Sequence, residues 1–98
     1  MIVFFEKERL TARSPDGVLM GQITFPRVKA GLVNIDRVVV SPDFRGQGVE
    51  NAMLDALFAH LTESGVKAAL TAPVAQQYVA DNPQWKRILP GDIHFTTH

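Results

Sequence analysis

The sequence predicts an α/β (α+β) fold in which helices pack on a mixed sheet. Turn signals separate short runs of β-forming residues in the N-terminal part, which is typical of antiparallel strands. One amphipathic helix pattern then lies between two apolar runs, residues 32–40 and 66–70. A helix that joins two strands in this way is a crossover, so we expect those two strands to be parallel neighbours.

The N-terminal strands are predicted to form an antiparallel meander. A Ser-Pro-Asp-Gly turn signal at residues 14–17 joins the second strand to the third, and we expect a loop at residues 26–31. The fourth strand ends in Val38, Val39 and Val40, and such a continuous apolar run predicts burial on both faces. The four strands are expected at residues 2–5, 9–13, 18–25 and 32–40.

The first helix is predicted to begin after Gly48 and to end at Ser64, with Gly65 in the left-handed position that favours glycine. Pro73 opens a second, short helix that runs to about residue 80. The first helix carries apolar residues at four-residue spacing: Val49, Met53, Leu57 and Leu61. Apolar residues of the C-terminal stretch are expected to close the core: Trp85, Ile88, Leu89, Ile93 and Phe95.

Length and composition narrow the class of protein. The chain has 98 residues, so we expect a single domain over residues 1–98. Its formal net charge is zero, which argues against a nucleic-acid binder built on charge. The absence of cysteine excludes disulfides, thiolate zinc sites and a cysteine nucleophile. No histidine pair has metal-ligand spacing, and the N-terminal apolar run is too short to span a bilayer. We therefore expect no metal, no membrane association and a cytoplasmic location.

A basic, glycine-rich loop lies between the valine-rich strand end and the first helix. Its sequence is Ser-Pro-Asp-Phe-Arg-Gly-Gln-Gly at residues 41–48. A helix that begins directly after such a loop presents free backbone N–H groups and the positive end of its dipole. This arrangement predicts a site for an anionic group, most often a phosphate.

Residues 38–48 resemble the central motif of the GNAT N-acetyltransferase superfamily, which is Arg/Gln-x-x-Gly-x-Gly/Ala between a strand and a helix. Farther along, residues 73–78 and Asn-Pro-Gln-Trp at residues 82–85 are similar to the tail of a small stand-alone (YjdJ-like) subgroup. The resemblance implies a GNAT fold and acetyl-CoA as co-substrate. It also implies transfer of the acetyl group to a primary amine of a small molecule or peptide.

In this family the glycine loop holds the pyrophosphate of acetyl-CoA on backbone amides. The strand before the loop pairs with the pantetheine arm, in a gap where the fourth and fifth strands splay apart. A backbone amide of Val39 or Val40 would then polarise the thioester carbonyl. The resemblance assigns acetyl-CoA binding to these residues: Val38, Val39, Val40, Arg45, Gly46, Gln47, Gly48, Val49, Glu50 and Asn51.

Tyr78 is the candidate proton donor, because a tyrosine on the helix after the fifth strand often has that role in GNAT enzymes; the alternative is a core tyrosine. Several residues depart from the pattern: Glu50 replaces a small residue, Ala72 a cysteine, Asn82 a histidine and Gln84 a glutamate. The alternative function is therefore a catalytically degenerate GNAT-fold module that acts in CoA binding or protein interaction. Either protein would be a monomer or a homodimer.

Overall fold

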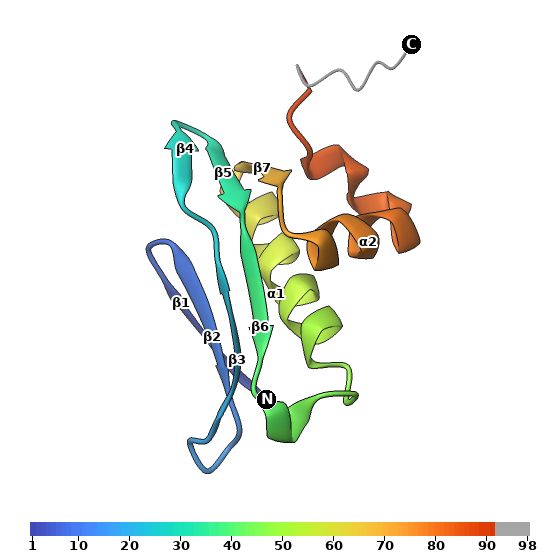
Figure 1. The fold of residues 1–98 in the computed structure, drawn as a ribbon. Coiled ribbons are helices and arrows are strands. Elements are labelled where there is room, and N and C mark those ends of the chain that lie inside the picture. Colours follow the sequence, from blue (N-terminus) through green and yellow to red (C-terminus); the bar gives the residue numbers. More distant parts are fainter. Residues whose placement is uncertain (92–98) are drawn as a thin grey trace.

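Two sheets lie side by side and carry their helices on one face (Figure 1). The computed structural model describes residues 1–91. The strands are β1 (Ile2–Glu6), β2 (Arg9–Arg13), β3 (Leu19–Thr24), β4 (Arg27–Lys29), β5 (Leu32–Ile35), β6 (Arg37–Val40) and β7 (Lys67–Leu70). The helices are the 3₁₀ turn η1 (Pro42–Phe44), α1 (Val49–Ser64), α2 (Pro73–Asp81) and the 3₁₀ segment η2 (Pro83–Ile88).

The strand order confirms the predicted fold class. The first sheet is antiparallel with the order β1-β2-β3-β6, and the second has the order β4-β5-β7. In the second sheet β5 and β7 are parallel neighbours, joined through the crossover helix α1. The predicted antiparallel meander is present in the first sheet, and the predicted parallel pair is in the second. The short C-terminal helix is also present.

Asp36 divides the expected strand 32–40 into β5 and β6, so the prediction of one continuous strand was wrong. The Asp36 N–H donates to Thr24 O at 3.2 Å, and Arg37 pairs with the same threonine. Two residues thus oppose one, which makes a β-bulge that bends the strand. The predicted loop at residues 26–31 also differs, because it contains β4, which pairs with β5.

The three valines at the end of β6 are not buried on both faces as predicted. Val40 is 8% exposed and packs in the core, but Val39 is 40% exposed and Val38 is half-buried. In the described part of the chain, helices cover only one face of this sheet (Figure 1), and alternate residues of a strand point to opposite faces. Val39 therefore faces the side of the sheet that lies away from α1.

The core lies between α1 and the sheets. Gly21 of β3 allows the close approach, because a Cβ there would lie 2.8 Å from Val39 O and 2.9 Å from Met53 Cε. Helix α1 ends as predicted, with Gly65 at φ 70°. Its buried side chains are Val49, Met53, Leu54, Leu57, Phe58 and Leu61.

An aromatic group joins α1 to the C-terminal elements. Phe58 of α1 meets Tyr78 of α2 and Trp85 of η2 edge to face, with ring centroids 5.3 and 5.5 Å apart. Ile88 is buried and Leu89 packs against the core, as predicted. The predicted core residues Ile93 and Phe95 lie outside the described residues. Within residues 1–91, no helix is long and apolar enough to cross a membrane.

Candidate functional site

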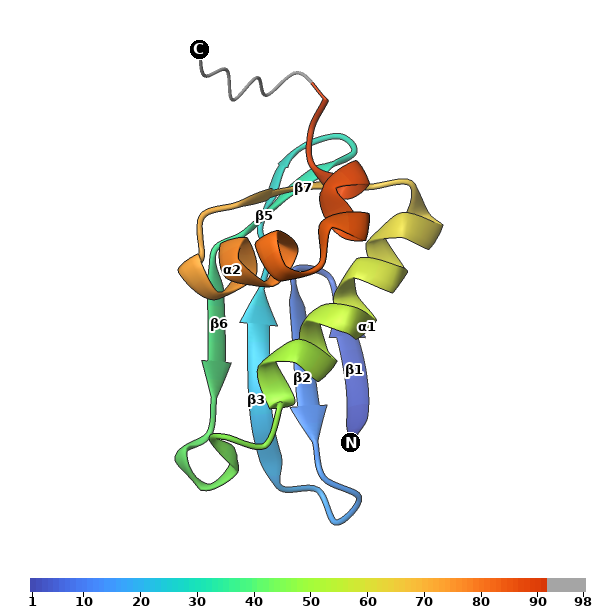
Figure 2. The same ribbon diagram turned by 90° about the vertical axis from the view of Figure 1, so that its right-hand side faces the viewer.

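The parallel strands part at the bulge. β5 and β7 stay paired up to Ile35 and Leu70. The next two amides, those of Thr71 and Ala72, both donate to Ile35 O, at 3.1 and 3.0 Å. Beyond this junction β6 continues along β3, whereas the other segment enters α2 (Figure 2). Among residues 1–91, β6 is therefore the last strand of its sheet, and no described strand pairs with its other edge, which we call the free edge.

Backbone groups of two valines point to this free edge. The Ser41 N–H donates to Met20 O at 2.8 Å, so this pair is a hydrogen-bonded pair of the β3–β6 ladder. Because hydrogen-bonded and non-hydrogen-bonded pairs alternate, Val39 bonds to β3, whereas the N–H and C=O of Val38 and Val40 point away from it. Of the two amides considered for polarising a carbonyl, it is that of Val40 that faces the edge.

The loop between β6 and α1 presents a row of free amides. Gly46 and Gly48 have φ values of 78° and 77°, a left-handed conformation that side chains disfavour. Gly48 is the N-cap of α1, and no side chain caps this helix end. Within the described chain, the N–H groups of residues 46–51 donate to no protein acceptor. Left-handed glycines before a helix N-terminus form an anion-binding concavity.

The two glycines of the loop have open space around them: apart from their chain neighbours, no heavy atom of the described chain lies within 4 Å of a Cβ added at Gly46 or Gly48. Arg45 and Gln47 are exposed. The Gln47 amide donates backwards to Asp43 O at 3.3 Å. Glu50 lies in the first turn of α1 and is partly buried. The site thus combines a cation, free amides and the helix dipole with two carboxylates in the same segment, Asp43 in η1 and Glu50 in the first turn of α1.

Tyr78 lies in the interface between α1 and α2. Its side chain is 4% exposed, and its hydroxyl donates to the carboxylate of Asp55 on α1. Burial, and then the hydrogen bond to Asp55, raise the pKa of Tyr78 to about 12, so its hydroxyl is protonated at neutral pH. Asp55 could not be identified from the sequence, because residues 23 positions apart meet only when the two helices pack.

The residues that depart from the motif have structural surroundings of their own. Ala72 is 4% exposed and is the N-cap of α2, to which it brings no side-chain hydrogen bond. The Asn82 side chain donates to Tyr78 O at 2.8 Å and thereby closes the end of α2. Gln84 is exposed. None of these three side chains lies in the glycine loop, so Glu50 is the departure that bears on it.

The comparison with protein-family models gives the family. Residues 9–88 match the model of the GCN5-related N-acetyl-transferase family, so the chain belongs to this family. Acetyl-CoA is the co-substrate consistent with this family and with relatives of known structure that were crystallised with CoA. No match was found among curated protein sequences.

Solved structures share the fold. A GCN5-like protein of Staphylococcus aureus, solved by NMR, is 22% identical with a TM-score of 0.73, over 99% of this chain and 95% of that one. Rv2747 of Mycobacterium tuberculosis, in complex with CoA, is 22% identical with a TM-score of 0.63, over 78% of this chain and 47% of its own. YhbS of Escherichia coli, a GNAT protein in complex with CoA, is 18% identical with a TM-score of 0.61, over 80% and 44%. The chain therefore spans about half the length of these last two relatives.

Proposed function

We propose that this protein is a small acetyl-CoA-dependent N-acetyltransferase that binds the pyrophosphate of the coenzyme at residues 45–51. The observation that carries the proposal is the row of amides at residues 46–51, which have no protein acceptor within the described chain. An anion there would gain several hydrogen bonds and the favourable end of the helix dipole. Arg45 would add a positive charge.

The pantetheine arm would pair with the free edge of β6. Its amide groups would bond to the backbone of Val38 and Val40, whose N–H and C=O groups point away from β3. The thioester would then lie at the start of β6, near the junction of Ile35 and Ala72. The Val38 amide points to the free edge there and, rather than that of Val40, would polarise the thioester carbonyl. The neutral amine nitrogen would attack this carbonyl carbon and lose one proton, the carbon–sulfur bond would break, and the leaving thiolate would take up one proton, so that the amide and free CoA form with no net release of protons.

Titration calorimetry with acetyl-CoA and with CoA tests the binding site. We expect that Gly48→Val weakens binding of both ligands at least about tenfold, because a side chain distorts a left-handed residue where the loop meets α1. Gly17→Val is the matched control, because Gly17 has a φ of 90°, a Cβ added there meets nothing of the described chain within 4 Å, and the residue lies in the turn between β2 and β3. No heat at hundreds of micromolar acetyl-CoA with the wild type would refute the proposal.

Amide hydrogen exchange tests the strand. Saturating CoA is expected to slow exchange at the Val38 and Val40 amides, while Val39, already bonded to β3, exchanges slowly with and without ligand. Equal protection of all three valines in both states would contradict pairing of the pantetheine with this edge.

A second candidate function is a CoA-binding module without catalysis, or a protein-interaction module. The observation that favours it is Ala72, which brings only a methyl group to the N-terminus of α2. In the leading proposal the acceptor is a primary amine of a small molecule or a peptide. Release of free CoA from acetyl-CoA in the presence of a panel of amines and peptides distinguishes the two functions: binding without turnover supports the module.

A further inference from the structure

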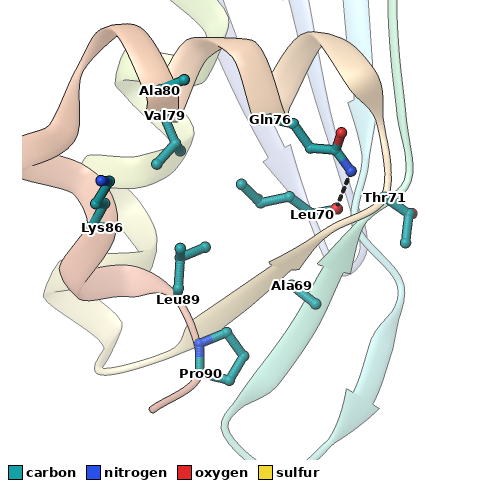
Figure 3. Close-up of a pocket in the computed structure, with 9 residues that line it drawn as sticks. All are labelled: Ala69, Leu70, Thr71, Gln76, Val79, Ala80, Lys86, Leu89 and Pro90. Atoms are coloured by element: carbon teal, nitrogen blue, oxygen red, sulfur yellow. Dashed lines mark hydrogen bonds between the residues drawn. The ribbon is translucent and has the colours of Figure 1, made fainter. Parts of the chain in front are cut away.

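A separate apolar cavity lies between β7, α2 and η2 (Figure 3). Its volume is about 380 Å³, which is within the range of small-molecule sites. None of the residues assigned to the coenzyme lines it. The lining residues are Ala69, Leu70, Thr71, Gln76, Val79, Ala80, Lys86, Leu89 and Pro90.

The walls of this cavity are aliphatic, and its polar groups lie at the two ends. Val79 and Pro90 are buried, and Leu70 and Leu89 are half-buried. The Gln76 amide donates to Leu70 O at 2.9 Å, so this side chain already has a partner (Figure 3). Lys86 is the charged residue of the lining, and it is exposed. Such a cavity suits a ligand with an aliphatic body and an anionic end.

The other end of the cavity lies at the junction of the strands. Thr71 lines the cavity, and its amide donates to Ile35 O at the point where β5 and β7 part. A thioester held at this junction could direct an acyl chain into the cavity. The same aliphatic chain could therefore occupy the cavity with a thioester at the Thr71 end or with a free carboxylate at the Lys86 end.

We propose that this cavity binds the aliphatic chain of a medium-length acyl group. The chain would replace water against Leu70, Val79 and Leu89. For a fatty acid, the carboxylate would lie at Lys86; for an acyl-CoA, the thioester would lie at the Thr71 end. The acyl-CoA form rests on the proposed function, whereas the fatty-acid form is independent of it.

The first test varies the length of the acyl chain. Calorimetry measures the affinity of the full protein chain for butyrate, hexanoate and octanoate, and in parallel for acetyl-, hexanoyl- and octanoyl-CoA. Each added methylene is expected to tighten binding of at least one series about fourfold until the cavity is full. Affinities that do not change with chain length in either series overturn the proposal. If CoA itself binds in that case, the coenzyme site stands and only the cavity assignment fails.

Filling the cavity is the second test. Ala80→Phe places a ring in the lining from the exposed side of α2, and Ala59→Phe is the matched control on the exposed side of α1. We expect octanoate or octanoyl-CoA to bind Ala80→Phe at least about tenfold more weakly than the wild type. Ala59→Phe should bind the same ligand with the affinity of the wild type. Ala69→Leu fills the same space from β7 should the first variant not fold. Unchanged affinity in a folded, filled variant overturns the proposal.

The source of the chain is identified by two further variants. Lys86→Met is expected to weaken octanoate binding about tenfold and to leave octanoyl-CoA unchanged, with Lys29→Met on β4 as control. Gly48→Val is expected to weaken binding of octanoyl-CoA and to leave octanoate binding unchanged. If neither variant changes the affinity for octanoate or for octanoyl-CoA, the ligand binds elsewhere and the proposal is overturned.

Discussion

At the scale of single residues, the hydroxyl of Tyr78 joins α2 to α1 through Asp55. Tyr78→Phe removes this hydrogen bond and leaves the ring contact with Phe58 in place. We expect the free energy of unfolding to fall by about 1–2 kcal/mol, which chemical denaturation measures. Asp55→Asn retains an acceptor oxygen and should cost less. If Tyr78→Phe keeps the acetyl-transfer rate of the wild type, Tyr78 is not the proton donor.

The same hydroxyl predicts a pH dependence of stability. The pKa of Tyr78 is about 12 in the folded protein, against 10.0 for an unperturbed tyrosine, so the folded state holds this proton more tightly. The stabilisation is complete below pH 10 and is lost as the pH rises to about 12. The difference in unfolding free energy between wild type and Tyr78→Phe should therefore shrink over this range. A constant difference would contradict the raised pKa.

Glu50 is the carboxylate beside the proposed pyrophosphate site. Glu50→Gln removes a like charge at similar size, and we expect acetyl-CoA to bind roughly fivefold more tightly at low salt. Glu63→Gln, in the last turn of the same helix, changes the net charge equally but lies far along α1 from the loop. Calorimetry on both variants separates a local effect from one of net charge. Equal affinities for Glu50→Gln and wild type would indicate that the carboxylate points clear of the ligand.

At the scale of elements, the sequence pattern predicted correctly those features that depend on neighbouring residues, such as helix bounds and the glycine loop. The bounds of α1 followed from its apolar periodicity and from Gly48 and Gly65 at its ends. The glycine loop of the site was recognisable for the same reason. The division of strand 32–40 was not predictable, because the bulge arises where Asp36 bonds to Thr24 on another strand. Burial of β6 was overestimated because a run of valines does not reveal that helices cover only one face.

The approach of α1 to the first sheet depends on Gly21. In Gly21→Ala the new methyl group would lie 2.8 Å from Val39 O, a backbone atom, and 2.9 Å from Met53 Cε. We expect a loss of about 1–3 kcal/mol in unfolding free energy, because packed cores resist added volume. Gly91→Ala is the control, because nothing in residues 1–91 lies within 4 Å of a Cβ added there. In a double-mutant cycle, Gly21→Ala should cost less in a Met53→Ala background than in the wild type, but still destabilise the protein, since the contact with the Val39 carbonyl stays.

At the scale of the whole molecule, helices cover one face of the sheets within residues 1–91 (Figures 1 and 2). The register places the side chains of Ile2, Phe4, Leu19 and Val39 on the opposite face of the first sheet, each 40% exposed or more. The formal net charge is zero at pH 7. Thr11, Arg13 and Gln22 share this face with them, so the four apolar side chains form an exposed patch within a mixed face. An exposed apolar patch on a chain without net charge to oppose association favours contact between copies.

Self-association through this face is therefore expected near pH 7, and sedimentation velocity over a concentration series measures it. Phe4→Glu places a charge in the middle of the face and should shift the protein towards monomer, because pairing would bury that carboxylate. Val28→Glu on β4 is the matched control: Val28 is 58% exposed, lies in the other sheet and changes the net charge equally. If both variants reduce association alike, net charge rather than this face controls it. Since Phe4 lies on the side of the sheet away from the glycine loop and α1, Phe4→Glu should bind acetyl-CoA as the wild type does.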